Sequence, residues 1–347
     1  MQLECELPHL LLRADADPAQ GVGHVMRCLA LAESWHCQGG RTTLLTSLLN
    51  PDLRQRTETL GIGLVEIPRP HPDTADLRTT LCALDRVSRD RAELPWVVLD
   101  GYHFDTAYQS LLRLAGCRLM VIDDTGHLPR YDADIIVNHR LDAQRLAYNC
   151  AQDTLLLLGT RFALLRPEFE RCHGMVRHCP EIARKVIVSL GETDAENTTL
   201  KIIEALEQIS IPDFEAKVVV GPLDPHFAEL ERTTRCLSSR FCLETGVTDP
   251  GSLMAWADLA VTAGGTTSWE LASMKVPALI FILAENQAGS AKALDAFGAA
   301  RCLGRPGDLN REEIADAIWC LMHDKEDRQR MSKRGEVLFD GRGVERV

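Results

Sequence analysis

The sequence predicts an α/β protein with two Rossmann-like, doubly wound domains that face each other across a cleft. Three observations lead to this fold class. The chain has 347 residues, too many for one ordinary core. Short apolar runs alternate with longer amphipathic stretches, as in β-α units around a parallel sheet. A segment near the middle breaks this rhythm. Ligands of such sheets gather at the carboxyl ends of the strands, so we look for functional residues there.

The two halves of the chain repeat the same alternation of predicted strands and helices. In the first half the strands are His9–Arg13, Thr42–Thr46, Trp96–Asp100, Arg118–Asp123 and Asp134–Val137, and the helices are Val25–Gln38 and Phe104–Ala115. In the second half the strands are Lys185–Leu190, Lys217–Val220, Leu259–Thr262 and Ala278–Leu283, and the helices are Thr198–Gln208, Thr267–Lys275 and Arg311–His323. Gly39-Gly40 supplies a stop signal after the first helix.

The segment from Arg166 to Arg184 separates the two halves. It contains Pro167, Pro180 and several charges without a strong hydrophobic period, which is typical of a domain link. We therefore expect an N-terminal domain over residues 1–166 and a C-terminal domain over residues 167–347. The last helix is a candidate for packing back on the N-terminal domain.

Composition and charge exclude several classes of protein. Hydrophobic residues make up 45% and charged residues 25% of the chain, as in an ordinary globular protein. The net charge of −12 disfavours nonspecific binding to nucleic acids or anionic membranes. No apolar run approaches the ~20 residues of a membrane span, and the start of the chain does not resemble a signal peptide.

The twelve cysteines indicate neither a disulfide framework nor a metal site. A chain with an ample core needs no disulfides, and no Cys-x-x-Cys pair is present. We expect reduced cysteines in a cytoplasmic protein. The oligomeric state is not readable from the sequence.

The first of three glycine turns leads into the first predicted helix. It ends in Gly21-Val22-Gly23-His24, and such a turn points free N–H groups at any anion near the helix start. The helix dipole favours the neutral form of His24, which can accept a proton from water. A capping or packing histidine is the alternative.

Two further glycine turns follow strands in the second half. Gly191-Glu192-Thr193-Asp194 could hold a sugar or phosphate on backbone amides, or simply cap a helix. Gly264-Gly265-Thr266-Thr267-Ser268 offers backbone N–H and hydroxyl donors that could wrap a diphosphate without lysine or metal. Glu270, one turn into the helix, could accept hydrogen bonds from both ribose hydroxyls.

Other polar residues stand directly after predicted strands. Asn286 and Gln287 could reach sugar hydroxyls or acetamido groups, although Asn286 could equally be an ordinary helix cap. In the first half, Asp100 and the pair Asp123-Asp124 could orient a sugar or cap helices. His103 and His127 compete with His24 as the candidate base.

Five segments, in this order, resemble one family. They are Gly-Val-Gly-His-Val-Met-Arg-Cys-Leu-Ala-Leu-Ala (21–32), Ile-Asp-Asp (122–124), Leu-Gly-Thr-Arg-Phe-Ala-Leu-Leu-Arg-Pro-Glu-Phe (158–169), Gly-Gly-Thr-Thr-Ser-Trp-Glu (264–270) and Leu-Ala-Glu-Asn-Gln (283–287). Together they resemble the UDP-sugar hydrolases of pseudaminic acid biosynthesis and the related spore-coat polysaccharide proteins. The resemblance extends from about residue 10 to the end of the chain.

This resemblance implies a GT-B-like fold, similar to the glycosyltransferase that adds N-acetylglucosamine in peptidoglycan synthesis. It implies a nucleotide-sugar substrate, a UDP-2,4-diacetamido-2,4,6-trideoxyhexose, whose anomeric C–O bond is cleaved with inversion and without metal or cofactor. The residue that activates water would be His24. The substrate-binding candidates are Asp15, Gly23, Arg27, Tyr102, Gly191, Thr193, Asn286 and Gln287. The nucleotide-binding candidates are Gly264, Gly265, Thr266, Thr267, Ser268 and Glu270.

Three stretches depart from the usual pattern of these hydrolases. Glu192 stands where a second glycine is usual, Asp100-Gly101-Tyr102-His103 replaces Asp-His-Tyr-Gly, and Asn138-His139 replaces Gln-Asn. Each difference could change the sugar or the acceptor.

Competing functions remain open at this point. A glycosyltransferase of the same fold would pass the sugar to a small alcohol or amine, and differs only in what attacks beside His24. A noncatalytic sugar-binding subunit would not depend on His24 at all. A NAD-dependent oxidoreductase is disfavoured, because no complete dinucleotide fingerprint is present.

Overall fold

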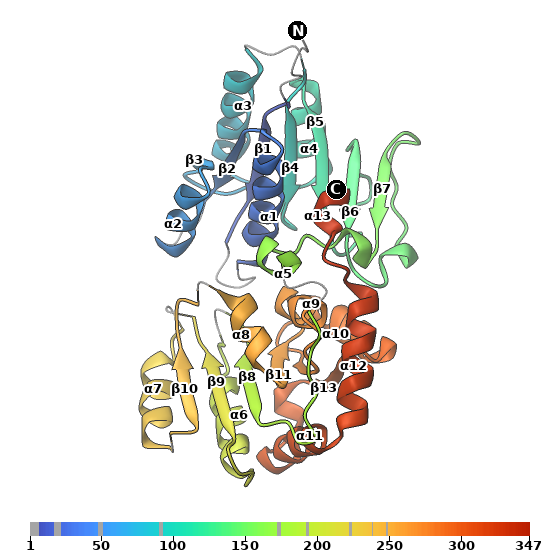
Figure 1. The fold of residues 1–347 in the computed structure, drawn as a ribbon. Coiled ribbons are helices and arrows are strands. Elements are labelled where there is room, and N and C mark those ends of the chain that lie inside the picture. Colours follow the sequence, from blue (N-terminus) through green and yellow to red (C-terminus); the bar gives the residue numbers. More distant parts are fainter. Residues whose placement is uncertain are drawn as a thin grey trace. The chain divides into compact units, whose positions relative to one another are not determined.

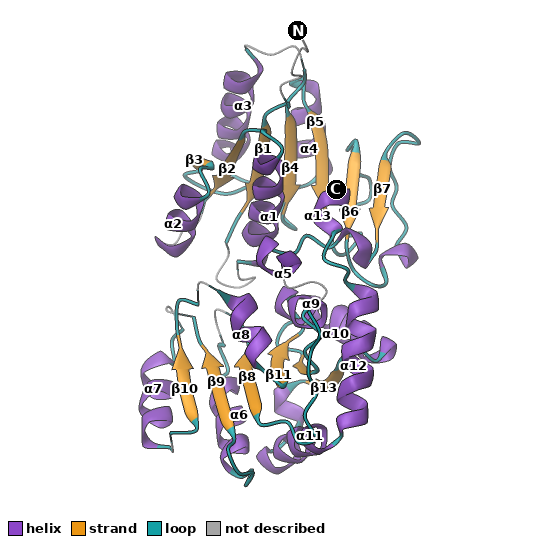
Figure 2. Cartoon of the chain, in the orientation of Figure 1, coloured by secondary structure: helices purple, strands orange, loops and turns teal. Residues whose placement is uncertain are grey.

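The structure is a computed structural model that describes residues 7–16, 22–47, 51–89, 93–171, 175–191, 194–221, 224–237, 239–247 and 249–347. The chain divides into two compact units (Figures 1 and 2). Unit 1 comprises Met1–Pro167 and Arg342–Val347, and unit 2 comprises Glu168–Gly341. None of the helices in the described ranges is long and apolar enough to cross a membrane.

Unit 1 contains a parallel sheet of seven strands in the order β3-β2-β1-β4-β5-β6-β7. The strands are β1 (Leu10–Ala14), β2 (Thr42–Thr46), β3 (Gly63–Glu66), β4 (Trp96–Asp100), β5 (Arg118–Ile122), β6 (Ile135–Asn138) and β7 (Leu155–Leu158). The helices are α1 (Gly23–Cys37), α2 (Pro51–Thr59), α3 (Thr74–Ser88), α4 (Thr106–Leu114) and the C-terminal α13 (Gly343–Arg346), with 3₁₀ turns η1 (Ala143–Arg145) and η2 (Thr160–Phe162). The order reverses between β1 and β4, which is the switch point of a doubly wound sheet.

Alternating side chains of the interior strand β1 pack on opposite faces of this sheet. Leu10 and Leu12 belong to the core beneath α1, whereas Leu11 belongs to the core beneath α3 and α4. This two-residue period decides which strand-end residues meet α1. The C-terminal α13 closes onto η2 at Gly343, where a Cβ atom would lie 2.1 Å from the carbonyl oxygen of Ala163.

Unit 2 contains a parallel sheet of six strands in the order β10-β9-β8-β11-β12-β13. The strands are β8 (Lys185–Ser189), β9 (Glu215–Val219), β10 (Phe241–Glu244), β11 (Leu259–Ala263), β12 (Ala278–Phe281) and β13 (Arg301–Gly304). The helices are α5 (Pro167–Arg171), which begins at the unit boundary, α6 (Thr198–Glu207), α7 (Phe227–Cys236), α8 (Pro250–Trp256), α9 (Thr266–Ser273), α10 (Glu285–Phe297), α11 (Arg311–His323) and α12 (Lys325–Leu338), with a 3₁₀ turn η3 (Pro306–Asp308).

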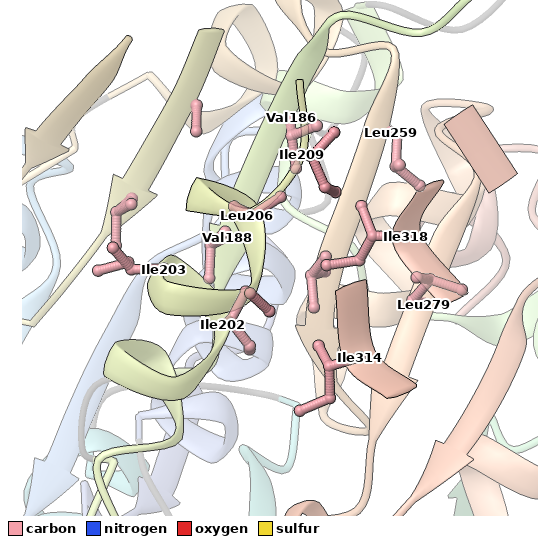
Figure 3. Close-up of a cluster of buried hydrophobic side chains, with 14 of the residues drawn as sticks. Val186, Val188, Ile202, Ile203, Leu206, Ile209, Leu259, Leu279, Ile314 and Ile318 are labelled. Atoms are coloured by element: carbon pink, nitrogen blue, oxygen red, sulfur yellow. The ribbon is translucent and has the colours of Figure 1, made fainter. Parts of the chain in front are cut away.

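The core of unit 2 forms where α6 and α11 cover one face of this sheet (Figure 3). Ile202 and Leu206 of α6 pack with Val188 of β8, and Ile318 of α11 extends the same cluster. Most of these side chains have no solvent exposure, which fixes α6 and α11 firmly on the sheet.

The helix α9 begins at the third glycine turn, and α12 packs against it. A Cβ atom on Gly335 of α12 would lie only 2.5 Å from the carbonyl oxygen of Ala272. The absence of a side chain at this position therefore permits close packing of the two helices.

Candidate active site

The first turn of α1 carries two of the residues that the sequence singles out. His24 is 8% exposed and Arg27, one turn later, is 4% exposed. Gly23 opens the helix, and the N-cap residue Val22 provides no side-chain cap. Gly21, at the start of the turn, lies outside the described residues. The turn of α1 thus places a histidine and an arginine on its inner face.

Three neighbouring strands bring polar residues to the same place. Because β4, β5 and β6 lie side by side and parallel, their carboxyl ends meet at one edge of the sheet. Asp100, Asp124 and His139 follow the alternation of Val98, Ile122 and Val137, which pack in the core beneath α1. All three therefore point towards α1, and all three are buried.

His24 and Asp100 form a buried pair. Nδ1 of His24 lies 2.6 Å from Oδ1 of Asp100, a side chain with no solvent exposure. Burial raises the pKa of the Asp100 carboxyl, but the charge of Arg27 and the hydrogen bonds from Arg27 and His24 outweigh it and hold the pKa below its usual value. Nη2 of Arg27 also lies 3.1 Å from Nδ1. Because the Asp100 carboxylate is ionised and is closer to Nδ1, at 2.6 Å, we assign the proton between these two atoms to Nδ1. The lone pair of neutral His24 is therefore on Nε2, which has no hydrogen-bond partner among the described residues.

Arg27 is held by two carboxylates. Its Nε and Nη2 atoms donate to the two oxygens of Asp100, with Nη2 at 2.5 Å from Oδ1. Its Nη1 atom lies 3.0 Å from both oxygens of Asp124 and 2.9 Å from Nε2 of His139. Burial raises the pKa of Asp124, but the Arg27 charge lowers it well below the usual value.

Tyr102 also joins this cluster. Its hydroxyl donates to Oδ2 of Asp124 at 3.0 Å, and its ring meets the His24 ring edge to face with centroids 5.1 Å apart. Tyr102 remains partly exposed, so a contact between its ring and a sugar stays a prediction. From the sequence, Asp100 and Asp124 were recognised as carboxylates at strand ends, and His139 as a departure from the family pattern. A place for these three residues beside His24 was not predicted.

Asp15 lies in a separate buried network. Arg13 donates from Nη1 and Nη2 to the two oxygens of Asp15 at 2.6 and 2.7 Å, and from Nη2 to Asp76 at 2.5 Å. Ser47 donates to Asp15 through both its backbone N–H and its hydroxyl, and Tyr108 donates to Asp76 at 2.6 Å. Through these contacts Asp15 fixes the position of the chain that precedes α1. A direct contact between Asp15 and a substrate stays a prediction.

The two competing histidines occupy less suitable positions than His24. Nε2 of His127 lies 3.1 Å from the Tyr102 carbonyl oxygen, and its Nδ1 lies 3.0 Å from the Thr125 hydroxyl. Nε2 of His103 is buried at 3.4 Å from Oδ2 of Asp15. Neither residue combines a carboxylate-bound Nδ1 with an unengaged Nε2, as His24 does.

In unit 2, the turn between β11 and α9 leaves a helix start uncapped. Among the residues that the structure describes, no side chain caps α9, and no atom lies within 4 Å of where a Cβ on its N-cap residue Gly265 would be. A Cβ on Gly264, by contrast, would lie 3.0 Å from the Gln287 carbonyl oxygen. Thr266 and Thr267 are half-buried at the helix start. Open space in front of free N–H groups suits an anion.

The neighbouring candidates of unit 2 support the same turn. Ser268 donates its hydroxyl to the Gly265 carbonyl oxygen at 2.6 Å, and Glu270 is buried at 8% exposure. Oε1 of Gln287 accepts from the Leu283 N–H at 3.1 Å, whereas Asn286 is exposed. Ser268 and Gln287 thus shape the turn through contacts within the chain.

The second glycine turn differs from the third. Gly191 is exposed with a φ of +108°, whereas Glu192 and Thr193 lie outside the described residues. Asp194 already accepts from the Thr199 N–H at 2.5 Å near the start of α6. A carboxylate therefore occupies the position that an anion would take at this helix. No group of three or more potential metal ligands occurs within the described part of the chain.

Comparison with known proteins identifies relatives but no family profile: none matches the chain. The spore coat polysaccharide biosynthesis protein SpsG of Bacillus subtilis is 24% identical over 344 residues, covering 98% of this chain and 96% of that protein. A Helicobacter pylori protein, named pseudaminic acid cytidylyltransferase and UDP-2,4-diacetamido-2,4,6-trideoxy-β-L-altropyranose hydrolase, is 25% identical over 205 residues. That match covers 58% of this chain and 37% of the H. pylori protein.

Solved structures decide the fold. MurG of Acinetobacter baumannii matches with a TM-score of 0.64 and 15% identity, covering 98% of both chains. The GT-B fold is confirmed. UGT2 of Phytolacca americana, solved with UDP-2-fluoro-glucose and pterostilbene, also matches this GT-B chain, with a TM-score of 0.64 and 14% identity over 96% of this chain and 94% of that chain. The predicted pair of Rossmann-like domains is thus present, and the two sequence relatives are proteins of sugar biosynthesis.

Proposed function

We propose that this protein is an enzyme that cleaves the anomeric C–O bond of a nucleotide-sugar and releases UDP, with His24 as the general base. One observation carries the proposal, namely the 2.6 Å bond from Nδ1 of His24 to the buried Asp100 carboxylate. A carboxylate in this position fixes the ring orientation and the tautomer, so that Nε2 can take a proton, and it stabilises the imidazolium that forms. The sequence relatives in sugar biosynthesis support the substrate class.

In the proposed reaction, Nε2 of His24 accepts a proton from water as the water oxygen attacks the anomeric carbon. The bond from that carbon to the diphosphate oxygen breaks, and UDP leaves with the bonding electrons. Donors that meet the developing negative charge lower the barrier for such a departure. We assign this role to the uncapped start of α9, with Thr266 and Thr267, and the ribose contact to Glu270. Ser268, whose hydroxyl donates to the Gly265 carbonyl oxygen, would hold the shape of this turn.

Water is the acceptor that we propose, because the H. pylori relative carries a hydrolase name for a UDP-2,4-diacetamido-2,4,6-trideoxy sugar. By this resemblance we propose a sugar of the same class, with Asn286 and Gln287 as candidate contacts. The alternative is transfer to a small alcohol or amine. It is supported by the GT-B fold shared with MurG and UGT2, and His24 would activate the acceptor in the same way.

UDP release from a panel of UDP-sugars separates these two reactions. Hydrolysis predicts release by the enzyme alone, and transfer predicts release only when an acceptor is added. In either case, His24→Gln is expected to lower kcat by about 10²–10⁴, the usual contribution of a positioned base. His127→Gln serves as the control and should leave kcat unchanged. If the His24 variant kept full activity, His24 would not be the general base.

Gly265→Ala tests the nucleotide site by filling the space in front of α9. A Cβ atom at this position meets nothing within 4 Å, so we expect the free energy of unfolding to change by no more than about 1 kcal/mol. A diphosphate held there would be displaced from its donors, and charge-assisted hydrogen bonds contribute about 1.5–3 kcal/mol each. Calorimetric titration should therefore show the Kd for UDP rising at least about tenfold.

The matched control for this experiment is Gly307→Ala. A Cβ atom on Gly307 would also meet nothing within 4 Å, and this residue lies in the same unit, in the 3₁₀ turn η3 rather than in the glycine turn. Its substitution should change neither stability nor the Kd for UDP. Equal affinity of both variants would place the diphosphate somewhere other than the start of α9.

A further inference from the structure

Arg27 sits at the centre of the charge cluster behind His24. Its guanidinium lies between the carboxylates of Asp100 and Asp124, and each of its three nitrogens donates within the cluster. With 4% exposure, little of this side chain faces solvent. A substrate would have to break buried ion pairs to reach it, and breaking such pairs is costly. A structural role for Arg27 within the cluster is therefore an alternative to the substrate contact that the sequence predicts.

We propose that Arg27 is a positioning residue for the reaction, holding the Asp100 carboxylate so that Oδ1 faces Nδ1 of His24. This inference rests on the proposed function of His24 as the base. Arg27 meets Asp100 side-on, with Nε on one oxygen and Nη2 on the other, so the plane of the carboxylate is fixed. Asp124 fixes the guanidinium in turn through Nη1.

The buried setting of Asp100 explains why this second partner is needed. The carboxylate has no solvent exposure, and in the described part of the chain its partners besides Arg27 are His24 and the weak donor Cys28, whose Sγ lies 3.9 Å away. An ionised buried carboxylate needs several donors to offset lost hydration. Without the two hydrogen bonds from Nε and Nη2 of Arg27, the Asp100 carboxylate can turn away from His24. The direction of the Nε2 lone pair is then no longer fixed.

The planar shape of the Arg27 guanidinium group matters as well as its positive charge. Lysine carries the same charge but presents a single ammonium group, which cannot bind both oxygens of a carboxylate side-on. Arg27→Lys should therefore release Asp100 while keeping the positive charge in the cluster. Arg27→Gln, which removes the charge but keeps an amide donor, is the second variant should the lysine variant fold poorly. Thermal unfolding identifies which of the two is folded.

The test combines proton NMR of the substrate-free protein with kinetics. The short bond between His24 and Asp100 predicts a far-downfield imidazole N–H signal, assigned by its loss in His24→Gln. We expect Arg27→Lys or Arg27→Gln to abolish this signal, to lower kcat for UDP release by about 10²-fold and to leave KM nearly unchanged. The control is Arg113→Lys, because Arg113 pairs with Asp132 at 2.6 Å elsewhere in unit 1, and it should change neither the signal nor kcat.

Each outcome decides the inference. A retained downfield signal in a folded Arg27 variant would overturn it, and so would a large rise in KM with an unchanged kcat, which is the behaviour of a substrate contact. If His24→Gln keeps full activity, the proposed base fails. The NMR comparison still decides whether Arg27 holds Asp100 in place, so the two failures are distinguishable.

Discussion

Asp100→Asn is expected to lower kcat for UDP release by about 10⁴-fold while the protein stays folded, which is the loss seen when a catalytic histidine loses its orienting carboxylate. Arg27 donates to both oxygens of Asp100, and an amide offers only one acceptor, which we expect to take the hydrogen bond from Nε. The NH₂ group of the new side chain then faces Nδ1 of His24. Nδ1 must accept, Nε2 becomes protonated, and the histidine can no longer take a proton from water.

The measurement is steady-state UDP release, with circular dichroism and thermal unfolding to confirm the fold. The control is Asp132→Asn, because Asp132 also pairs with an arginine of unit 1, Arg113 at 2.6 Å, but at a partly exposed position. It should retain the activity of the unchanged protein. An Asp100→Asn variant with more than a tenth of the original kcat would contradict the role of this carboxylate.

Arg13→Met should destabilise the protein by about 3–5 kcal/mol, because it leaves two buried carboxylates without their cation. Arg13 has no solvent exposure and pairs with both Asp15 and Asp76. Methionine fills much of the same volume, so the loss of the charge is what the substitution tests. Urea unfolding gives the free-energy difference. Arg89→Met is the control: its pair with Asp85 is largely exposed and should contribute only about 0.5 kcal/mol or less.

The same network gives an acid dependence of stability. Burial raises the pKa of Asp15 and of Asp76, but hydrogen bonds and the charge of Arg13 outweigh it and lower both pKa values. Carboxylates with lowered pKa values stabilise the fold above their unfolded pKa of about 4, and this stabilisation is lost as the pH falls below it. The stability gap between the unchanged protein and Arg13→Met should therefore narrow on acidification. A gap independent of pH would contradict the paired carboxylates.

The sequence predicted the buried strands and the helices α1, α4, α6, α9 and α11, whose hydrophobic periods are clear, but not the long helices α3 and α10. It did not identify the edge strands β3, β7, β10 and β13. β3 (Gly63–Glu66) has two exposed and two half-buried residues, so its hydrophobic pattern hardly differs from that of a loop. The polar helix α12 was missed because few of its residues are apolar.

The candidate base was identified from the glycine turn before α1, but its carboxylate partner was not. Asp100 stands at a strand end, as several other aspartates do, and the sequence carries no record of which strands are neighbours. The order β1-β4-β5-β6 and the alternation of side chains select Asp100 and Asp124 for the α1 face. The family resemblance implied a substrate contact for Arg27, and this stays a prediction. The position of Arg27 between two buried carboxylates appears only in three dimensions.

Cleavage in water enriched in oxygen-18 tests most directly whether water attacks the anomeric carbon of the nucleotide-sugar. Mass spectrometry of quickly quenched products should find one heavy oxygen in the released sugar and none in UDP. Free sugar incubated alone corrects for exchange of its anomeric oxygen. Heavy oxygen in the terminal phosphate of UDP, or no cleavage without an added acceptor, would contradict this mechanism.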